Sequence, residues 1–433
     1  KTSAAVYETM KSADKDAVWV MQGWLFVSAA GRKFWTKERM KPFLDSVPDD
    51  GMVILELYSE NRPRWQDTEA YYGKPWIWNM LHNFGGNIGM YGKAPFIAFE
   101  PARVTKDARR GNLSGIGLTM EGAEQNPMIY QLMLEHVWND KPINLKEWTD
   151  GYILRRYGQP DENVSKAWEI LLKTVYRNNR KDQGAPESAI TGRPTFNENA
   201  AWTWTDLVYY ENRDFAPAWE YMIKAADTLG ESNGFRYDLV DVTRQAMANY
   251  ATALHRQISY TWNAGDLDSY RILTERFLDL ISDMDRLLKT RPEFLLGRWI
   301  ADASAWGTTD EERRLYKFNA RDLVSIWGRK DVADISDYSC RQWSGLLDSY
   351  YRGRWEEFFR QTTECLEKGE KWDEKKFYDY IREWGWEWAN RTDEAFATEP
   401  EGDAVEVSRE MYAKWWKLIS RSEVFKQKKN ELQ

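Results

Sequence analysis

The chain has 433 residues, of which 42% are apolar and 30% charged, and its formal net charge is −8. This composition is typical of a globular protein of two or three domains, and the negative charge disfavours proteins that bind nucleic acids or anionic membrane surfaces. The sequence has no run of about 18 apolar residues, so it predicts no membrane-spanning helix.

Cysteine and histidine are scarce in this chain. Two cysteines, Cys340 and Cys365, cannot build a disulfide framework or a zinc site, and three widely spaced histidines argue against a His-ligated metal centre. We therefore expect no metal and no other cofactor. Aromatic residues are abundant, with 24 Trp, 23 Tyr and 17 Phe. Aromatic rings can stack on the apolar faces of sugars, although we expect most of these Trp residues to be packing.

The first 140 residues predict alternating strands and helices. Near-continuous apolar runs of strand length, separated by helical patterns, are typical of parallel βα units buried on both faces. The predicted strands are 17–24, 52–58, 75–81 and 113–120, and the predicted helices are 3–13, 36–46, a helical turn before the last strand, and a helix from Asn126-Pro127 onward.

Four parallel strands alone would leave two sheet edges uncovered. An open α/β sheet fits this pattern, and so does half of a (β/α)8 TIM barrel, which needs eight strands. The chain begins in helical rhythm at Lys1 with almost no linker, which favours the half-barrel. We therefore expect residues 1–140 to be the C-terminal part of a (β/α)8 catalytic barrel, with the first half upstream in the same enzyme.

From about residue 142 the strand-like runs disappear and amphipathic helical patterns dominate, so residues 141–433 are predicted to form a large all-α domain. The polar segment 178–199 contains Gly and Pro and is predicted to be a long surface loop. The predicted helices are 145–157, 162–176, 202–229, 237–262, 267–288, 294–306, 311–326, 340–365, 374–388 and 405–420.

Polar or aromatic residues follow each predicted strand of the barrel part. Because the carboxyl ends of parallel barrel strands meet at one face, we expect these residues to converge there. A carboxylate beside aromatic rings and hydrogen-bonding groups suits a sugar site. The residues are Gln22 and Trp24 after the first strand, Glu60 after the second, His82, Asn83 and Phe84 after the third, and Glu121 after the fourth.

Each of these candidates also has a purely structural interpretation. Glu121 could complement the dipole of the helix that Asn126 and Pro127 begin. Trp24 could be packing, and the run 82–87 could be a loop held by side-chain caps and glycine turns. In the helical domain, Trp327 and Tyr338 stand at the two ends of a segment between helices. They could cover a pocket, or they could anchor neighbouring helices, which is the commoner role of buried aromatics.

Three motifs resemble those of glycoside hydrolase family 89, the α-N-acetylglucosaminidases. The motifs are Val18-Trp-Val-Met-Gln-Gly-Trp-Leu-Phe26, Trp78-Asn-Met-Leu-His-Asn-Phe-Gly-Gly-Asn87 and Gly117-Leu-Thr-Met-Glu-Gly-Ala-Glu-Gln-Asn126. The resemblance continues through 235–245, 294–297, 327–328, 335–338 and 350–355, so it covers nearly the whole chain. It implies a (β/α)8 barrel followed by a large all-α domain, and an exo-acting, retaining hydrolase that releases terminal α-linked N-acetylglucosamine from glycans.

By position, Glu121 resembles the catalytic nucleophile of this family. The family's acid/base is a Glu in an Asn-Glu pair, which the resemblance places upstream of Lys1, and residues 1–140 contain no such pair. Retaining glycosidases need two carboxyl groups about 5–5.5 Å apart; Glu60 is the next strand-end carboxylate, but we do not expect it to be the acid. The residues that resemble the lining of the sugar pocket are Trp24, Leu57, Leu81, Phe84, Trp327, Ile335 and Tyr338, with His82 and Asn83 in support.

The resemblance also implies a partner and a location. The partner would be a glycan or glycosaminoglycan with terminal α-linked N-acetylglucosamine, and the protein would be secreted, hence extracellular or periplasmic, or lysosomal. Two other classes stay open: a non-catalytic carbohydrate-binding fragment or relative that keeps the aromatic pocket, and a helical scaffold whose aromatics form a protein interface. The oligomeric state is not predicted.

Overall fold

The computed structural model describes residues 1–179, 188–197, 208–328, 331 and 336–422. The chain forms two compact units. The first, which we call the sheet unit, comprises Lys1–Phe84, Gly92–Trp148 and Arg177–Gly184. The second, which we call the helical unit, comprises Gly85–Tyr91, Thr149–Tyr176 and Ala185–Gln433. The short segment Gly85–Tyr91 therefore packs with the helices, although it follows the third strand in the sequence.

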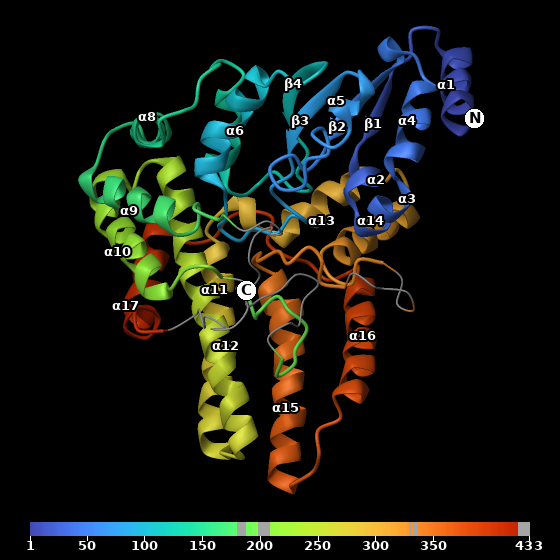
Figure 1. Ribbon diagram of the computed structural model, residues 1–433. Helices are drawn as coiled ribbons and strands as arrows, with labels where there is room; N and C mark the ends of the chain where they lie inside the picture. The colour runs from blue at the N-terminus through green and yellow to red at the C-terminus, as the bar shows by residue number, and fades with distance from the viewer. Residues whose placement is uncertain (180–187, 198–207, 329–330, 332–335, 423–433) are drawn as a thin grey trace. The chain divides into compact units, whose positions relative to one another are not determined.

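The sheet unit is built on four parallel strands in the order β1-β2-β3-β4 (Figure 1). The strand pairs are in parallel register, with Trp19 opposite Met52, Ile54 opposite Trp76 and Trp78 opposite Ile116. The prediction of four sequential βα-type strands is confirmed. Their bounds are β1 (Trp19–Gln22), β2 (Met52–Glu56), β3 (Trp76–Met80) and β4 (Leu113–Leu118).

Burial differs between the central and the edge strands. In β3, Trp76, Trp78 and Met80 are at most 1% exposed, whereas Val20 of β1 is 60% exposed and β4 is half-buried along most of its length. The expectation that every strand is buried on both faces is therefore wrong for β1 and β4, because each of these has a paired neighbour on one side only within the described sheet.

Helices α1 (Thr2–Ala13), α4 (Lys37–Asp45) and α7 (Pro127–Glu135) lie where the sequence predicts them. Two details differ. The strand predicted to run to Trp24 ends at Gln22, because Gly23 bonds to Leu55 O and Trp24 begins the short helix α2 (Trp24–Val27). The predicted helical turn before β4 is the 13-residue helix α6 (Ala94–Lys106). The remaining short helices are α3 (Ala29–Phe34), η1 (Asp49–Gly51) and α5 (Glu69–Tyr72).

Pro101 lies inside α6 and leaves one backbone carbonyl without its helical donor. A proline has no N–H, so Ile97 O cannot receive the usual bond from residue 101. His136 Nε2 lies 2.8 Å from Ile97 O and takes that place, and His136 is buried. This histidine is therefore explained by the packing of α6.

We expect His136→Ala to lower the free energy of unfolding by about 1–3 kcal/mol, because the buried carbonyl of Ile97 loses this bond. The second substitution Pro101→Ala supplies an N–H for Ile97 O and is expected to restore part of that loss. The melting temperatures of the two single variants and the double variant test this. If the double variant loses as much unfolding free energy as the two single variants together, the two sites are not coupled.

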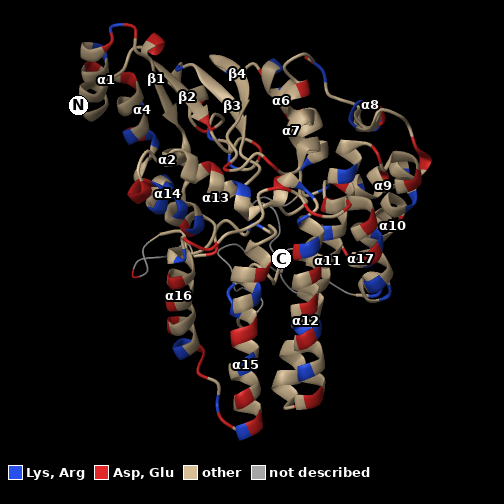
Figure 2. Ribbon diagram, turned by 180° about the vertical axis from the view of Figure 1, so that it is seen from behind, with Lys and Arg blue, Asp and Glu red and all other residues tan. Residues whose placement is uncertain are grey.

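The helical unit is all-α in its described residues, and two predicted helices, 145–157 and 267–288, are confirmed to the residue. Long helix α11 (Asn233–Ala264) packs against α10, α12 and α17, and Figures 1 and 2 both show α12 and α15 side by side. The other bounds from residue 145 are α8 (Leu145–Tyr157), α9 (Glu162–Lys173), α10 (Asn212–Leu229), α12 (Leu267–Leu288), η2 (Pro292–Phe294), α13 (Leu296–Ala305), α14 (Asp310–Leu323), the π-helix η3 (Leu347–Arg352), α15 (Gly353–Lys368), α16 (Glu374–Asn390) and α17 (Ala404–Ile419).

The predicted surface loop 178–199 is wrong for its described part. Residues 188–192, 194 and 195 are buried against helices. Ser188 Oγ donates to Ala248 O at 3.1 Å, Ile190 O accepts from Trp355 Nε1 at 3.0 Å, and Thr195 O lies 2.7 Å from His255 Nε2. Polar composition is misleading here, because side chains from other elements satisfy the loop's buried backbone groups.

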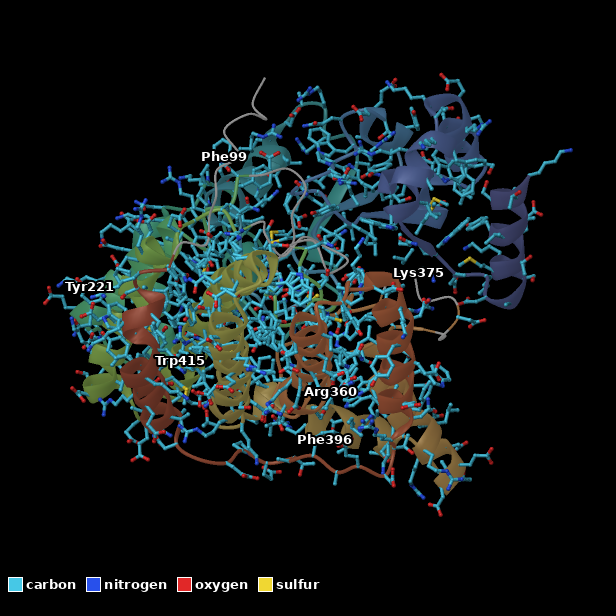
Figure 3. The ribbon with its side chains drawn as sticks, turned by 90° about the horizontal axis from the view of Figure 1, so that it is seen from below. Phe99, Tyr221, Arg360, Lys375, Phe396 and Trp415 are labelled. Carbon is cyan, nitrogen blue, oxygen red and sulfur yellow. The ribbon has the colours of Figure 1, made fainter. Side chains whose placement is uncertain are left out.

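Charged residues of both signs cover the outer helices, as Figure 2 shows for α12, α15 and α16. Figure 3 labels Arg360 on α15 and Lys375 on α16, which form exposed ion pairs with Glu364 and Asp379. Each such pair contributes at most about 1 kcal/mol, so most of the stability comes from the buried core.

Among the residues described, no helix combines the length and the apolar character needed to cross a membrane. The fully buried tryptophans confirm a packing role for Trp65, Trp76, Trp78, Trp219, Trp355 and Trp388.

Candidate active site

The carboxyl ends of β2, β3 and β4 are joined by hydrogen bonds. Thr119 donates its N–H to Met80 O at 3.0 Å and its hydroxyl to Leu57 O at 2.9 Å. Glu121 N donates to Asn83 O at 3.3 Å, and Ser59 N donates to Asn79 O at 3.1 Å. The segments that follow these strands therefore converge, as the parallel arrangement predicts.

Three aromatic rings form a cluster at this edge of the sheet. Trp24 lies 6.3 Å from Tyr58 and 6.2 Å from Phe84 between ring centroids, and Tyr58 lies 5.5 Å from Phe84. Tyr58 is buried, whereas Trp24 and Phe84 are half-buried. The cluster therefore offers partly exposed ring surface on a buried base. The sequence analysis did not single out Tyr58, although its position two residues after β2 is a signal of the same kind as that of the residues chosen.

Glu121 is exposed in the loop between β4 and α7. It lies six residues before Pro127, so it is outside the first turn of α7, where a carboxylate would complement the helix dipole. Asn126 stands at the N-cap position with φ 44°, but its side chain does not cap the helix, and its Nδ2 donates to Gln125 Oε1 at 2.8 Å. Asn126 thus stands at the predicted N-cap position, but the prediction that its side chain caps the helix is wrong.

The residues after β3 lie beside this loop. Leu81, His82 and Asn83 are buried, and Leu57 is half-buried at the end of β2. His82 adopts a positive φ of 60°, and its ring packs edge-on against Tyr130 at 5.2 Å. Burial lowers the pKa of His82 to about 3, so its imidazole is neutral near pH 7 and suits a structural role.

Glu60 is 7% exposed, and its carboxylate faces the backbone of the neighbouring strand end. Oε1 accepts from His82 N at 2.7 Å and from Leu81 N at 3.0 Å, and Oε2 lies 3.2 Å from Leu81 N. Burial raises the pKa of Glu60 to about 7. A carboxyl group engaged in this way is not presented to a substrate, which agrees with the expectation that Glu60 is not the acid.

Trp327 and Tyr338 lie in the helical unit and pack edge-to-face, with ring centroids 4.9 Å apart at 82°. Both are half-buried, so the pair is an internal contact that also keeps some exposed ring surface. The structure thus brings together Trp24, Leu57, Leu81, His82, Asn83, Phe84 and Glu121 as one set in the sheet unit, and Trp327 with Tyr338 as a second set. Ile335 lies outside the described residues.

A buried ion pair supports this second set. Arg354 Nη1 lies 2.8 and 2.9 Å from the two carboxylate oxygens of Asp337, the residue before Tyr338, and Tyr350 OH donates to the same carboxylate at 3.3 Å. Asp337 has a φ of 64°. Tyr350 lies on the π-helix η3, a turn type that is frequent near functional sites.

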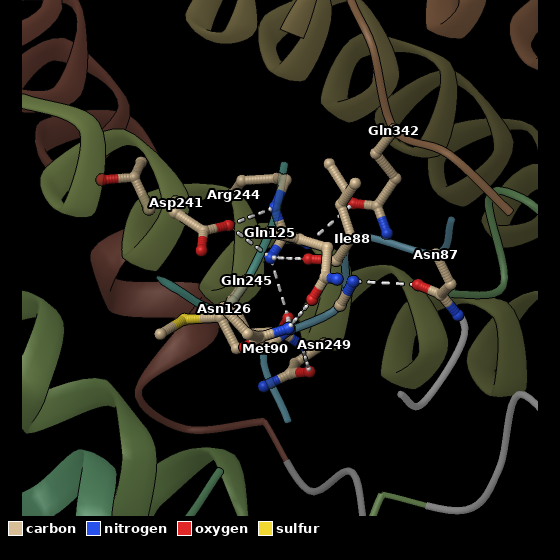
Figure 4. Close-up of polar contacts among 12 residues, drawn as sticks. Asn87, Ile88, Met90, Gln125, Asn126, Asp241, Arg244, Gln245, Asn249 and Gln342 are labelled. Carbon is tan, nitrogen blue, oxygen red and sulfur yellow. Dashed lines mark hydrogen bonds and ion pairs between the residues drawn. The ribbon is translucent and has the colours of Figure 1, made fainter. Parts of the chain in front are cut away.

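The loop that continues from Phe84 is held by a buried polar network on α11 (Figure 4). Arg244 Nη2 donates to Ile88 O at 3.1 Å and to Asp241 Oδ1 at 2.7 Å, and its Nη1 donates to Gln342 Oε1 at 3.1 Å. Gln245 Oε1 accepts from Met90 N at 2.8 Å. The motif 235–245 therefore anchors Gly85–Tyr91. The sequence analysis singled out this motif only through the family resemblance.

Within the described part of the chain, no group of three or more His, Cys, Asp or Glu side chains is arranged to hold a metal ion.

Family models and known proteins match this arrangement. The model described as "Alpha-N-acetylglucosaminidase (NAGLU) tim-barrel domain" matches residues 1–140, and the model described as "Alpha-N-acetylglucosaminidase (NAGLU) C-terminal domain" matches residues 148–414. The human protein "Alpha-N-acetylglucosaminidase" is 30% identical over 421 residues, which cover 96% of this chain and 54% of that protein.

Solved structures of a family 89 glycoside hydrolase from Clostridium perfringens are also similar. Its complex with PUGNAc matches with a TM-score of 0.84 and 34% identity, over 95% of this chain and 46% of that one. A variant with two glutamates replaced by glutamine, in complex with its substrate GlcNAc-alpha-1,4-galactose, matches with a TM-score of 0.83 and 34% identity, over 94% and 45%. The chain thus spans about half the length of these relatives. The predicted fold class, part of a (β/α)8 barrel followed by an all-α domain, is confirmed by these matches.

Proposed function

The chain belongs to the alpha-N-acetylglucosaminidase family, and on this basis we propose that it forms part of an exo-acting, retaining glycoside hydrolase that releases terminal α-linked N-acetylglucosamine from glycans. One observation carries the proposal. Glu121 is exposed at the carboxyl edge of a parallel sheet, and its N–H is fixed to Asn83 O beside the Trp24–Phe84 rings.

In the proposed reaction, a Glu121 carboxylate oxygen attacks the anomeric carbon while the bond from that carbon to the leaving oxygen breaks. A second carboxyl group gives its proton to that oxygen. By the family resemblance, this group is a glutamate upstream of the chain shown. A water molecule deprotonated by the same group then hydrolyses the covalent glycosyl-enzyme, and Glu121 is released as a carboxylate.

The neighbouring residues would shape the sugar pocket. Trp24 and Phe84 offer half-buried rings for stacking, and Leu57 and Leu81 flank them with apolar surface. His82 and Asn83 support the loop backbone that meets Glu121. From the helical unit, we assign Trp327, Tyr338 and Ile335 to the pocket by the family resemblance. That resemblance also leads us to propose a secreted or lysosomal protein, which localisation of the tagged protein tests.

Turnover of 4-nitrophenyl α-N-acetylglucosaminide by the full-length protein tests this function. We expect release of nitrophenol, with the α-anomer of N-acetylglucosamine appearing first in the NMR spectrum, since two displacements retain configuration. First formation of the β-anomer would contradict the retaining mechanism. A folded protein that binds N-acetylglucosamine without turnover would instead favour a carbohydrate-binding relative, which the partly exposed aromatic cluster would equally serve.

Trp24→Ala is expected to raise KM for this substrate by about 10-fold, because one stacked ring contributes roughly 0.5–1.5 kcal/mol beyond the apolar area that it buries. Trp138→Ala is a suitable control, since Trp138 is 85% exposed and is outside the proposed pocket. Initial rates at varied substrate concentration separate KM from kcat. Equal KM values for the two variants would remove Trp24 from the proposed pocket.

A further inference from the structure

We propose that Glu60 is a positioning residue of the active site, whose carboxylate sets the backbone of Leu81–Asn83 and, through Asn83, the backbone of Glu121. This inference rests on the proposed function, because it assigns Glu60 to the placement of the proposed nucleophile. Glu60 itself would touch neither the substrate nor the reacting atoms.

The first step is the direct contact between Glu60 and the strand end after β3. Its carboxylate oxygens accept the N–H groups of Leu81 and His82 at 2.7–3.2 Å. A carboxyl oxygen accepts such N–H bonds in both the protonated and the ionised form, and the bonds are about twice as strong in the ionised form. A side chain from the neighbouring strand end thus accepts these two backbone N–H groups.

The second step is the conformation that these bonds maintain. His82 has a φ of 60°, in the left-handed region that a side chain with a Cβ rarely adopts. Such a residue persists only where its surroundings hold it in place. The bond from His82 N to Glu60 Oε1 is the shortest of the set, at 2.7 Å. The carboxylate therefore holds the chain at His82, the residue directly before Asn83.

The third step connects this turn with the proposed nucleophile. Asn83 is the next residue after His82, and its carbonyl accepts the N–H of Glu121 at 3.3 Å. The direction of that carbonyl depends on the backbone of His82 and Asn83. A turn that relaxed at His82 would move the acceptor of Glu121 N–H, and with it the Glu121 side chain. A displacement of about 1 Å at a reacting group can cost about 100-fold in rate.

The residue that follows Glu60 extends the same support to the aromatic cluster. Asn61 Nδ2 donates to Tyr58 OH at 2.6 Å, and Asn61 Oδ1 accepts from Lys93 Nζ at 2.8 Å. Lys93 is buried, and its ammonium lies 3.5 Å from the backbone carbonyl of Glu60. Tyr58 in turn packs on Trp24 and Phe84. The residues that follow β2 thus contact both the aromatic cluster and the loop that meets Glu121.

Glu56 provides a matched control. It is a buried carboxylate at the end of β2 and accepts bonds from Ser59 Oγ, Arg64 N, Trp65 N and Tyr71 OH at 2.7–3.0 Å. The two glutamates are therefore both buried, and each accepts two backbone N–H groups. Glu56 bonds to the backbone of the segment that follows β2, whereas Glu60 bonds to the backbone of Leu81 and His82, which leads to Asn83 and so to Glu121.

The experiment compares Glu60→Gln with Glu56→Gln in the full-length protein on 4-nitrophenyl α-N-acetylglucosaminide. We expect Glu60→Gln to lower kcat by about 10- to 100-fold with KM within about threefold, because the amide NH₂ of Gln repels one of the two backbone N–H groups. Glu56→Gln is expected to change kcat by less than about threefold per folded molecule. An equal loss of kcat in the two variants, or none in Glu60→Gln, would overturn the proposal.

Two further measurements keep the test decisive. If Glu60→Gln does not fold, Glu60→Asp replaces it, since its carboxylate is one methylene too short to reach both N–H groups, and wild-type kcat in that variant would equally overturn the proposal. Amide hydrogen exchange gives a readout without activity. The amides of Leu81 and His82 are expected to exchange faster in Glu60→Gln and not in Glu56→Gln. An inactive wild-type protein with this exchange pattern would refute the proposed function while retaining the contact.

Discussion

Glu121→Gln is expected to lower kcat for an α-N-acetylglucosaminide on the order of 10⁴- to 10⁶-fold, the range seen when a catalytic nucleophile is removed. The glutamine amide has nearly the same shape as the carboxylate but cannot form the glycosyl-enzyme. Because Glu121 is exposed and lies outside the core, we expect the melting temperature to change by less than about 1 °C, in keeping with a surface substitution. Steady-state rates together with thermal melting test both parts.

Glu124→Gln is the matched control, because Glu124 is an exposed carboxylate in the same loop, three residues further on. It is expected to keep kcat within about twofold, as a surface substitution away from the reacting atoms. Azide gives an independent readout with Glu121→Ala. The anion can attack the anomeric carbon from the vacated side and give the β-glycosyl azide. Near-normal turnover by Glu121→Gln would remove Glu121 from the proposed mechanism.

Arg354→Met is expected to destabilise the helical unit by about 3–5 kcal/mol, because removing one partner leaves the other charge buried without compensation. Arg354 and Asp337 side chains are only 3% and 4% exposed. Arg354 also donates to Gly192 O at 3.3 Å, so the loss extends to the buried loop 188–195. For a unit of this size, the melting temperature should fall by roughly 10 °C.

Two companion variants sharpen this prediction. Arg360 lies on the same helix α15, but its side chain is 53% exposed, so Arg360→Met is expected to change the stability by at most about 1 kcal/mol. Adding Asp337→Asn to Arg354→Met removes the isolated charge and should recover part of the stability. Arg354→Met is also expected to raise KM, because its partner Asp337 precedes Tyr338, which we assign to the sugar pocket. Equal melting temperatures for Arg354→Met and Arg360→Met would contradict the assigned role of the buried pair.

Local patterns in the sequence determined the element types. Helices α8 and α12 lie where apolar residues recur at helical spacing, and the four strands lie where short apolar runs end in polar residues. These predictions hold because helix and strand periodicity are properties of neighbouring residues. The same signal placed Trp24, Phe84 and Glu121 at strand ends, which the parallel sheet brings together.

Only the tertiary structure decided which partners the buried polar groups have. Glu60 bonds to backbone groups that follow another strand, Arg354 pairs with Asp337, and Arg244 holds the carbonyl of Ile88. Segment 188–195 has the composition of a surface loop and is buried nonetheless. A polar side chain in a sequence can face water or a distant partner equally well. Burial forces it to find a partner, and burial depends on how segments far apart in the chain pack.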